Sequence, residues 1–359
     1  MKSILFGNGL NIKFNKSEYS NDEILKRGLK FVKTDEKMQK ICPPETLNLL
    51  DAMFQTVPDI VAGCYDAVAQ DCIKELAHFK ANYSNKNINN VGQIGIEDYF
   101  LVIHLIYSYN RSVNNTDGDY NVDKEKSAQE CYRALCLAGI YNLGAINKLY
   151  TRYSDKFIEY INSFDEVFTT NYDSNLDSIY FGEVQHIHGK FDELNELYDP
   201  NSFRNSLSDD QFASNNLINI RGYEYLHSTA LMSYSGINKF KKINNVHNLN
   251  KLTIEQIRAV PEGSVMEKDR ELAIEAKEAI AKDSSLRFQE YDAYNKFKNL
   301  KGDITIVGLS AANDNHIFKQ IDNLNIYFYY FSNADKGLAT EVLPSSAKLE
   351  SVEKMWEIL

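Results

Sequence analysis

The sequence predicts an α/β fold in which a Rossmann-like parallel sheet has helices on both faces and a large all-helical insertion. Short apolar runs, each ending in a turn rich in Gly, Asn or Asp, indicate strands that are buried on both faces. A long segment with helical periodicity separates the first run from the second. The runs lie at residues 2–7, 166–169, 183–187, 303–307 and 325–331.

Composition limits the function classes. The chain has 359 residues, of which 43% are hydrophobic, and a formal net charge of −11. This hydrophobic content is typical of a protein with a large core. Nucleic acids and anionic membranes require basic surfaces, so the charge disfavours both as partners. We find neither a leader peptide nor an apolar run of membrane-spanning length, and we expect a soluble, cytoplasmic protein.

Cysteine spacing bears on metal content. The five cysteines are odd in number and form no C-x-x-C pair. This pattern indicates a reducing compartment, buried free thiols and no zinc site. We therefore expect no bound metal and no zinc.

The first strand leads into the turn Gly7-Asn8-Gly9, followed by Asn11. Glycines at this place let the backbone approach a pyrophosphate, which the amides of a helix start can bind. The full dinucleotide fingerprint is absent, so an ordinary tight turn is an open alternative to nucleotide binding.

Residues 23–152 have helical spacing and form the predicted insertion, while residues 1–22 and 153–359 form the Rossmann-like core with its lid segments. His104, between Ile103 and Leu105, is interpreted as a packed helix histidine rather than a ligand.

The segment from residue 190 to residue 250 has only a weak hydrophobic pattern, and we expect a lid within it. Thr253 and Gln256 predict a capping box, and residues 265–298 predict one or two helices. A terminal helix is expected after Pro344, with Leu349 on its apolar stripe.

Polar clusters follow both central strands. Thr169 to Asp173 ends the first, and His186-Ile187-His188-Gly189 ends the second. Because ligands bind at the carboxyl ends of parallel strands, these clusters predict a site. Asn171 and His188 are expected to meet there, and His186 is a candidate supporting residue.

Four motifs in this order resemble the sirtuin-like family. They are Gly7-Asn8-Gly9, the T-x-N-x-D motif from Thr169 to Asp173, His188-Gly189, and Gly308-Leu309-Ser310 followed by Asp314. The resemblance implies binding of NAD+, with Asn171 and His188 as the catalytic pair. It also implies that Asp173 meets the nicotinamide amide and that Ser310 contacts phosphate or ribose. Asn11 stands where the family often has Ser or Thr, and Asp314 is either a ribose ligand or a helix cap.

The chain lacks the four-cysteine zinc module of deacylating sirtuins. It is similar to zinc-free bacterial relatives that act as NAD-depleting effectors of anti-phage abortive infection. The resemblance therefore implies an NAD+ hydrolase that releases nicotinamide and ADP-ribose and is activated by a trigger, by homo-oligomer assembly or by a partner defence protein that senses infection. A sensor subunit that binds NAD+ or ADP-ribose without catalysis is the alternative, and a third class is a Rossmann-like enzyme of other chemistry, such as a glycosyl or nucleotide hydrolase. Linear and cyclic ADP-ribose are alternative products of this reaction.

Overall fold

The structure is a computed structural model, and it describes residues 1–42, 46–114, 122–192, 222–231, 252–261, 263, 267–282, 289–311 and 313–359. These residues divide between two compact units. The first unit contains the described parts of Met1–Lys16, Gly144–Leu207 and His227–Leu359. The second contains the described parts of Ser17–Leu143 and Ser208–Leu226. The predicted lid within residues 190–250 lies largely outside the described residues.

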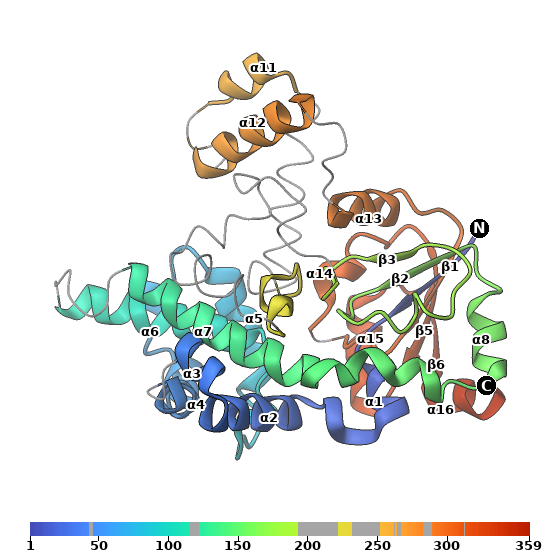
Figure 1. Cartoon of the computed structure of the whole chain (residues 1–359), viewed down its shortest axis with the longest axis horizontal. Coiled ribbons are helices and arrows are strands. Elements are labelled where there is room, and N and C mark those ends of the chain that lie inside the picture. Colours follow the sequence, from blue (N-terminus) through green and yellow to red (C-terminus); the bar gives the residue numbers. More distant parts are fainter. Residues whose placement is uncertain are drawn as a thin grey trace. The chain divides into compact units, whose positions relative to one another are not determined.

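The first unit is built on a six-stranded parallel sheet (Figure 1). Its strand order is β3-β2-β1-β4-β5-β6, and every neighbouring pair is parallel. This is the order of the doubly wound Rossmann fold, so the predicted fold class is confirmed. The strands are β1 (Lys2–Phe6), β2 (Glu166–Thr169), β3 (Val184–His186), β4 (Asp303–Val307), β5 (Asn325–Tyr330) and β6 (Lys348–Ser351).

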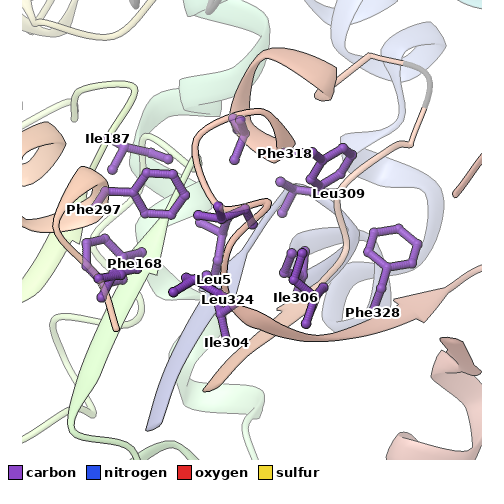
Figure 2. Packing of buried hydrophobic residues seen from close by; sticks show 14 of the residues in the cluster. Leu5, Phe168, Ile187, Phe297, Ile304, Ile306, Leu309, Phe318, Leu324 and Phe328 are labelled. Carbon is purple, nitrogen blue, oxygen red and sulfur yellow. The ribbon is translucent and has the colours of Figure 1, made fainter. Parts of the chain in front are cut away.

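Each face of the sheet has its own hydrophobic core, because successive strand side chains point to opposite faces. On one face, Ile4 and Phe6 pack with helices α1 (Gly9–Asn15), α8 (Asp155–Ile161) and α16 (Val352–Ile358). On the other, Leu5 packs with helices α13 (Gln289–Lys298), α14 (Asn315–Phe318) and α15 (Asn333–Val342). Figure 2 shows this second core, where Phe168 and Phe297 meet edge to face at 5.3 Å. These helices on both faces were expected for buried parallel strands.

The regular elements in the described part of the second unit are all helical. The α-helices are α2 (Asn21–Thr34), α3 (Glu36–Ile41), α4 (Thr46–Ala62), α5 (Ile73–Tyr83), α6 (Asp98–Asn114) and α7 (Val122–Tyr141). Short 3-10 helices join them: η1 (Lys16–Tyr19), η2 (Asp66–Val68), η3 (Val91–Gln93), η4 (Asn142–Arg152) and η7 (Glu224–His227), of which η1, η4 and η7 run across the unit boundaries.

Two further helices precede α13 in the first unit. They are α11 (Ile254–Arg258) and α12 (Glu267–Lys282). The predicted capping box at the start of α11 is confirmed, because the Thr253 side chain accepts from the Gln256 amide and the Gln256 side chain accepts from the Thr253 amide.

The carboxyl-terminal segment differs from the prediction. Residues 348–351 form strand β6 before α16 begins, so Leu349 is a strand residue rather than part of a terminal helix. The strand has only four residues and pairs along a single edge, with β5, so its sequence carries little strand signal.

The expectation of buried thiols is wrong for Cys64, which is exposed. The other four cysteines are buried, and all five are free.

None of the helices that the structure describes combines the length and the apolar character needed to cross a membrane.

Candidate functional site

The switch point of the sheet lies between β1 and β4, where the direction of strand addition reverses. The turns after these strands are in direct backbone contact, because the Gly7 amide donates to Val307 O at 2.9 Å and the Gly9 amide donates to Gly308 O at 3.0 Å. A Cβ on Gly9 would lie 2.5 Å from the Gly308 Cα, and Gly308 has a φ of +77°. Glycine is therefore required here for turn-to-turn packing, and the amides of Gly7 and Gly9 are already used by protein carbonyls.

The loop after β2 is built around the buried carboxylate of Asp173. Its Oδ2 accepts from the Asn11 side chain of α1 at 2.7 Å. Its Oδ1 accepts from the Asn175 backbone amide at 3.1 Å and from the Asn175 side chain at 2.5 Å. Burial raises the pKa of Asp173, while these hydrogen bonds oppose the rise. Asp173 thus holds the loop in place. The Oδ1 of Asn11 is buried and has no hydrogen-bond partner among the residues that the structure describes.

Asn171 lies between the first strand and the loop. Its side chain donates to Gly7 O at 3.2 Å, and its backbone N–H donates to Thr169 Oγ1 at 3.0 Å. Only 7% of Asn171 is exposed. The predicted catalytic amide therefore lies at the switch point itself, beside the Gly7-Asn8-Gly9 turn, of which Asn8 is the exposed residue.

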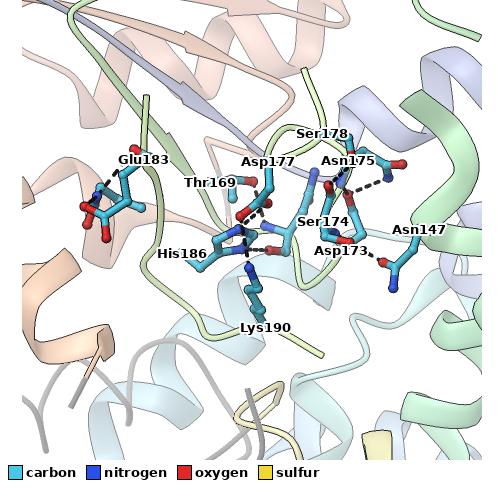
Figure 3. Close-up of polar contacts among 12 residues, drawn as sticks. Asn147, Thr169, Asp173, Ser174, Asn175, Asp177, Ser178, Glu183, His186 and Lys190 are labelled. Carbon is cyan, nitrogen blue, oxygen red and sulfur yellow. Dashed lines mark hydrogen bonds and ion pairs between the residues drawn. The ribbon is translucent and has the colours of Figure 1, made fainter. Parts of the chain in front are cut away.

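A second polar group fixes the end of β3 (Figure 3). His186 Nδ1 donates to Asn171 O at 3.0 Å, and His186 Nε2 lies 2.9 Å from Asp177 Oδ2. Lys190 Nζ lies 3.0 Å from the other oxygen of Asp177. Burial would raise the pKa of Asp177, but hydrogen bonds and charges from His186 and Lys190 lower it to about 2. Asp177 is thus an anion near neutral pH, and His186 supports the backbone of Asn171.

His188 contacts a histidine from a distant part of the chain. Its Nε2 lies 3.3 Å from Nε2 of His316 on α14, and the two rings stack with centroids 5.5 Å apart. Strands β2 and β1 lie between β3 and β4 in the sheet. The imidazole pair therefore joins the segments that follow β3 and β4, which are not neighbours in the sheet. In such a hydrogen bond one ring donates and the other accepts.

The turn after β4 is closed by Asp314. Its carboxylate accepts from the Ser310 amide at 2.8 Å, and Ser310 Oγ accepts from the Asn313 amide at 3.3 Å. Burial raises the pKa of Asp314 to about 6. Asp314 occupies the position before α14, but its side chain makes no capping bond to that helix. The capping role considered from the sequence is therefore wrong in its atomic detail.

The structure brings most of the predicted residues to one edge of the sheet. Four further residues of these hydrogen-bond networks were not predicted from the sequence: Asn175, Asp177, Lys190 and His316. The first two had a signal, because Asn171, Asp173, Asn175 and Asp177 form an alternating series of amides and carboxylates. His316 had none, since it stands 128 residues from His188 in the chain.

The architecture is that of a doubly wound α/β protein with buried polar side chains at its switch point. Comparison of the chain with protein-family models, with curated proteins and with solved structures gave no match.

Proposed function

We propose that this protein is an NAD+ hydrolase that cleaves the bond between nicotinamide and ribose to give nicotinamide and ADP-ribose. The observation that carries the proposal is the position of Asn171 and His188. Both are buried polar residues beyond the carboxyl ends of adjacent strands. Asn171 hydrogen-bonds to Gly7 at the glycine-lined switch point, and His188 contacts His316, which follows β4. Dinucleotides bind at that place in doubly wound folds.

The chemistry fits the residue types. Water attacks C1′ of the ribose, the bond from C1′ to the nicotinamide nitrogen breaks, and its electron pair leaves with nicotinamide. Because nicotinamide leaves as a neutral molecule, no strong acid is needed. The water must lose a proton, and an imidazole within reach can accept it. His188 takes this role in the proposal, and His316, 3.3 Å away, can receive the proton from it.

Other residues bind and orient the substrate. The Asn171 amide is suited to hydrogen bonding with ribose hydroxyls or the attacking water. In this proposal Asp173 lies beside the nicotinamide amide, as the motif resemblance implies, and Asn11 holds the Asp173 carboxylate through a hydrogen bond of 2.7 Å. The turn after β4, which contains Ser310 and Asp314, would bind the phosphates or the second ribose. Because the amides of Gly7 and Gly9 are engaged, phosphate contacts in this proposal come from other groups of these turns.

The biological role follows from the motif resemblance alone. An effector of an anti-phage abortive-infection system would deplete NAD+ in the infected cell after a trigger or a partner protein activates it. This part of the proposal is tested by measuring NAD+ in cells that express the protein, with and without phage infection. A fall in NAD+ only after infection supports it, and unchanged NAD+ in infected cells contradicts it.

The enzymatic part is tested by incubating the purified protein with NAD+ and separating the products by chromatography. We expect equal amounts of nicotinamide and ADP-ribose, and the same chromatogram distinguishes linear from cyclic ADP-ribose. NAD+ that binds but stays intact would instead support the sensor alternative.

A further inference from the structure

A polar cluster in the second unit surrounds His104, which the sequence presented as a packed helix histidine. Asp71 and Cys72 stand directly before helix α5, and His104 lies on α6. The ligand atoms of these three residues all lie within 4.8 Å of one another. Carboxylate, thiolate and imidazole are the three side-chain groups that bind zinc in proteins.

Each of the two nitrogens of the His104 ring faces a carboxylate. Nε2 lies 3.2 Å from Asp71 Oδ1, on the side of Cys72. Nδ1 lies 2.7 Å from Oε1 of Glu125, whose side chain is only 9% exposed. The other oxygen of Glu125 accepts from Arg111 Nη1 at 2.6 Å. A carboxylate on the second nitrogen is the usual companion of a metal-binding histidine, because it fixes the ring orientation and raises the ligand's basicity.

We propose that Asp71, Cys72 and His104 bind one divalent cation of the zinc class, with Glu125 orienting the His104 ring. A thiolate disfavours Mg²⁺ and Ca²⁺, which prefer oxygen ligands. Ligand atoms in a tetrahedral zinc site are about 3.4 to 3.6 Å apart, by the usual bond lengths. Ligand atoms within 4.8 Å of one another need only small adjustments to reach that spacing. Three protein ligands leave the fourth position for water or a substrate group.

The site has no paired-cysteine signature in the sequence. Here a single cysteine contributes, and the histidine follows it by 32 residues (104 − 72). The Asp71 side chain is 68% exposed, which gives a cation access from solvent. The expectation of a metal-free protein therefore needs a direct test.

The test uses the full chain after treatment with a chelator, with Zn²⁺ added in a calorimeter and Co²⁺ added in a spectrophotometer. We expect one equivalent of either ion and a thiolate-to-cobalt absorption band. Cys72→Ser should abolish that band, and His104→Asn should abolish stoichiometric binding. Glu125→Gln should weaken affinity about 10- to 100-fold. Cys64→Ser is the matched control, since Cys64 is an exposed free cysteine of the same unit, and it should change nothing.

A labelling experiment on the unmutated protein covers the case in which a variant does not fold. Zn²⁺ should slow alkylation of Cys72 by iodoacetamide without protecting Cys64, as read by peptide mass. Absence of stoichiometric binding, a cobalt band retained in folded Cys72→Ser, or unprotected Cys72 would each overturn the proposal. Rapid alkylation that Zn²⁺ does not affect would indicate a nucleophilic cysteine activated by His104 instead.

Discussion

At the scale of single residues, the site depends on side chains that hold one another across long stretches of sequence. Asn11 and Asp173 are 162 residues apart in the chain, and His188 and His316 are 128 apart. The sequence indicated that Asn171, Asp173 and His188 follow strand ends, because strand ends are local features. Their distant partners, Asn11 for Asp173 and His316 for His188, could not be predicted, since a hydrogen bond between distant residues leaves no periodic pattern.

The His188 and His316 pair leads to a prediction for the proposed reaction. If His316 orients His188 and receives its proton, His316→Phe should lower kcat. The phenyl ring keeps the stacking, but it can accept neither a hydrogen bond nor a proton from His188. The loss should be smaller than that of His188→Ala, and KM for NAD+ should change little. Steady-state kinetics on both variants checks this. A His316→Phe enzyme with wild-type kcat would show that the pair has no catalytic importance.

Asp177 leads to a prediction about acid stability. Its pKa of about 2 is depressed below the unfolded value, so its contribution is present above roughly pH 4 and is lost as pH falls toward 2. Asp177→Asn should therefore lower the free energy of unfolding at pH 7 by about 1 to 2 kcal/mol. Urea denaturation of both proteins across this pH range is the measurement. The difference should shrink below about pH 3, and a pH-independent difference would contradict the assignment.

At the scale of elements, the strands that the sequence predicted are those with continuous apolar runs. Strands β1, β2, β4 and β5 were located to within a residue, because each contains a run of apolar or β-branched residues. Strand β6 alternates between exposed and half-buried residues, and helix α14 has only four residues. Neither element has a sequence pattern that distinguishes it from the neighbouring loops. The glycines after β1 and β4 were identified in the sequence, but the contact between their two turns was not predicted and is known only from the structure.

The glycines of these turns make that contact testable. Gly9→Ala places a Cβ 2.5 Å from the Gly308 Cα, so we expect a loss of roughly 1 to 3 kcal/mol in the free energy of unfolding. Gly337→Ala is the control, because a Cβ added there, inside α15, meets no described atom within 4 Å apart from its chain neighbours and the backbone of its own helix. Alanine there should stabilise by about 0.5 to 1 kcal/mol. Thermal unfolding of both variants is sufficient, and equal effects would refute the turn contact.

At the scale of the whole molecule, the fold separates a Rossmann-like unit from a helical unit. The proposed catalytic residues all belong to the first unit and the proposed cation ligands to the second. Two sites in separate units can be tested independently, because a variant in one leaves the residues of the other unchanged.

Regulation is expected for the molecule as a whole if the proposed function is correct. An NAD+ hydrolase that was always active would deplete its own host, so we expect low basal turnover that rises on assembly, on contact with a partner protein or with a nucleotide signal. Specific activity measured over a range of protein concentrations and with candidate activators checks this. Rapid, concentration-independent turnover by an isolated monomer would contradict it.

The central claim is that Asn171 and His188 together cleave NAD+, and a double-mutant cycle on NAD+ turnover tests it most directly. Because both side chains are buried, each alanine variant can cost about 1 to 3 kcal/mol of stability, so retained folding is verified by circular dichroism and thermal unfolding. We expect Asn171→Ala and His188→Ala each to lose ~100- to 10,000-fold in rate. The two losses should not multiply in the double variant, since residues that act as a unit are non-additive. A folded His188→Ala protein that cleaves NAD+ at the wild-type rate would contradict the account.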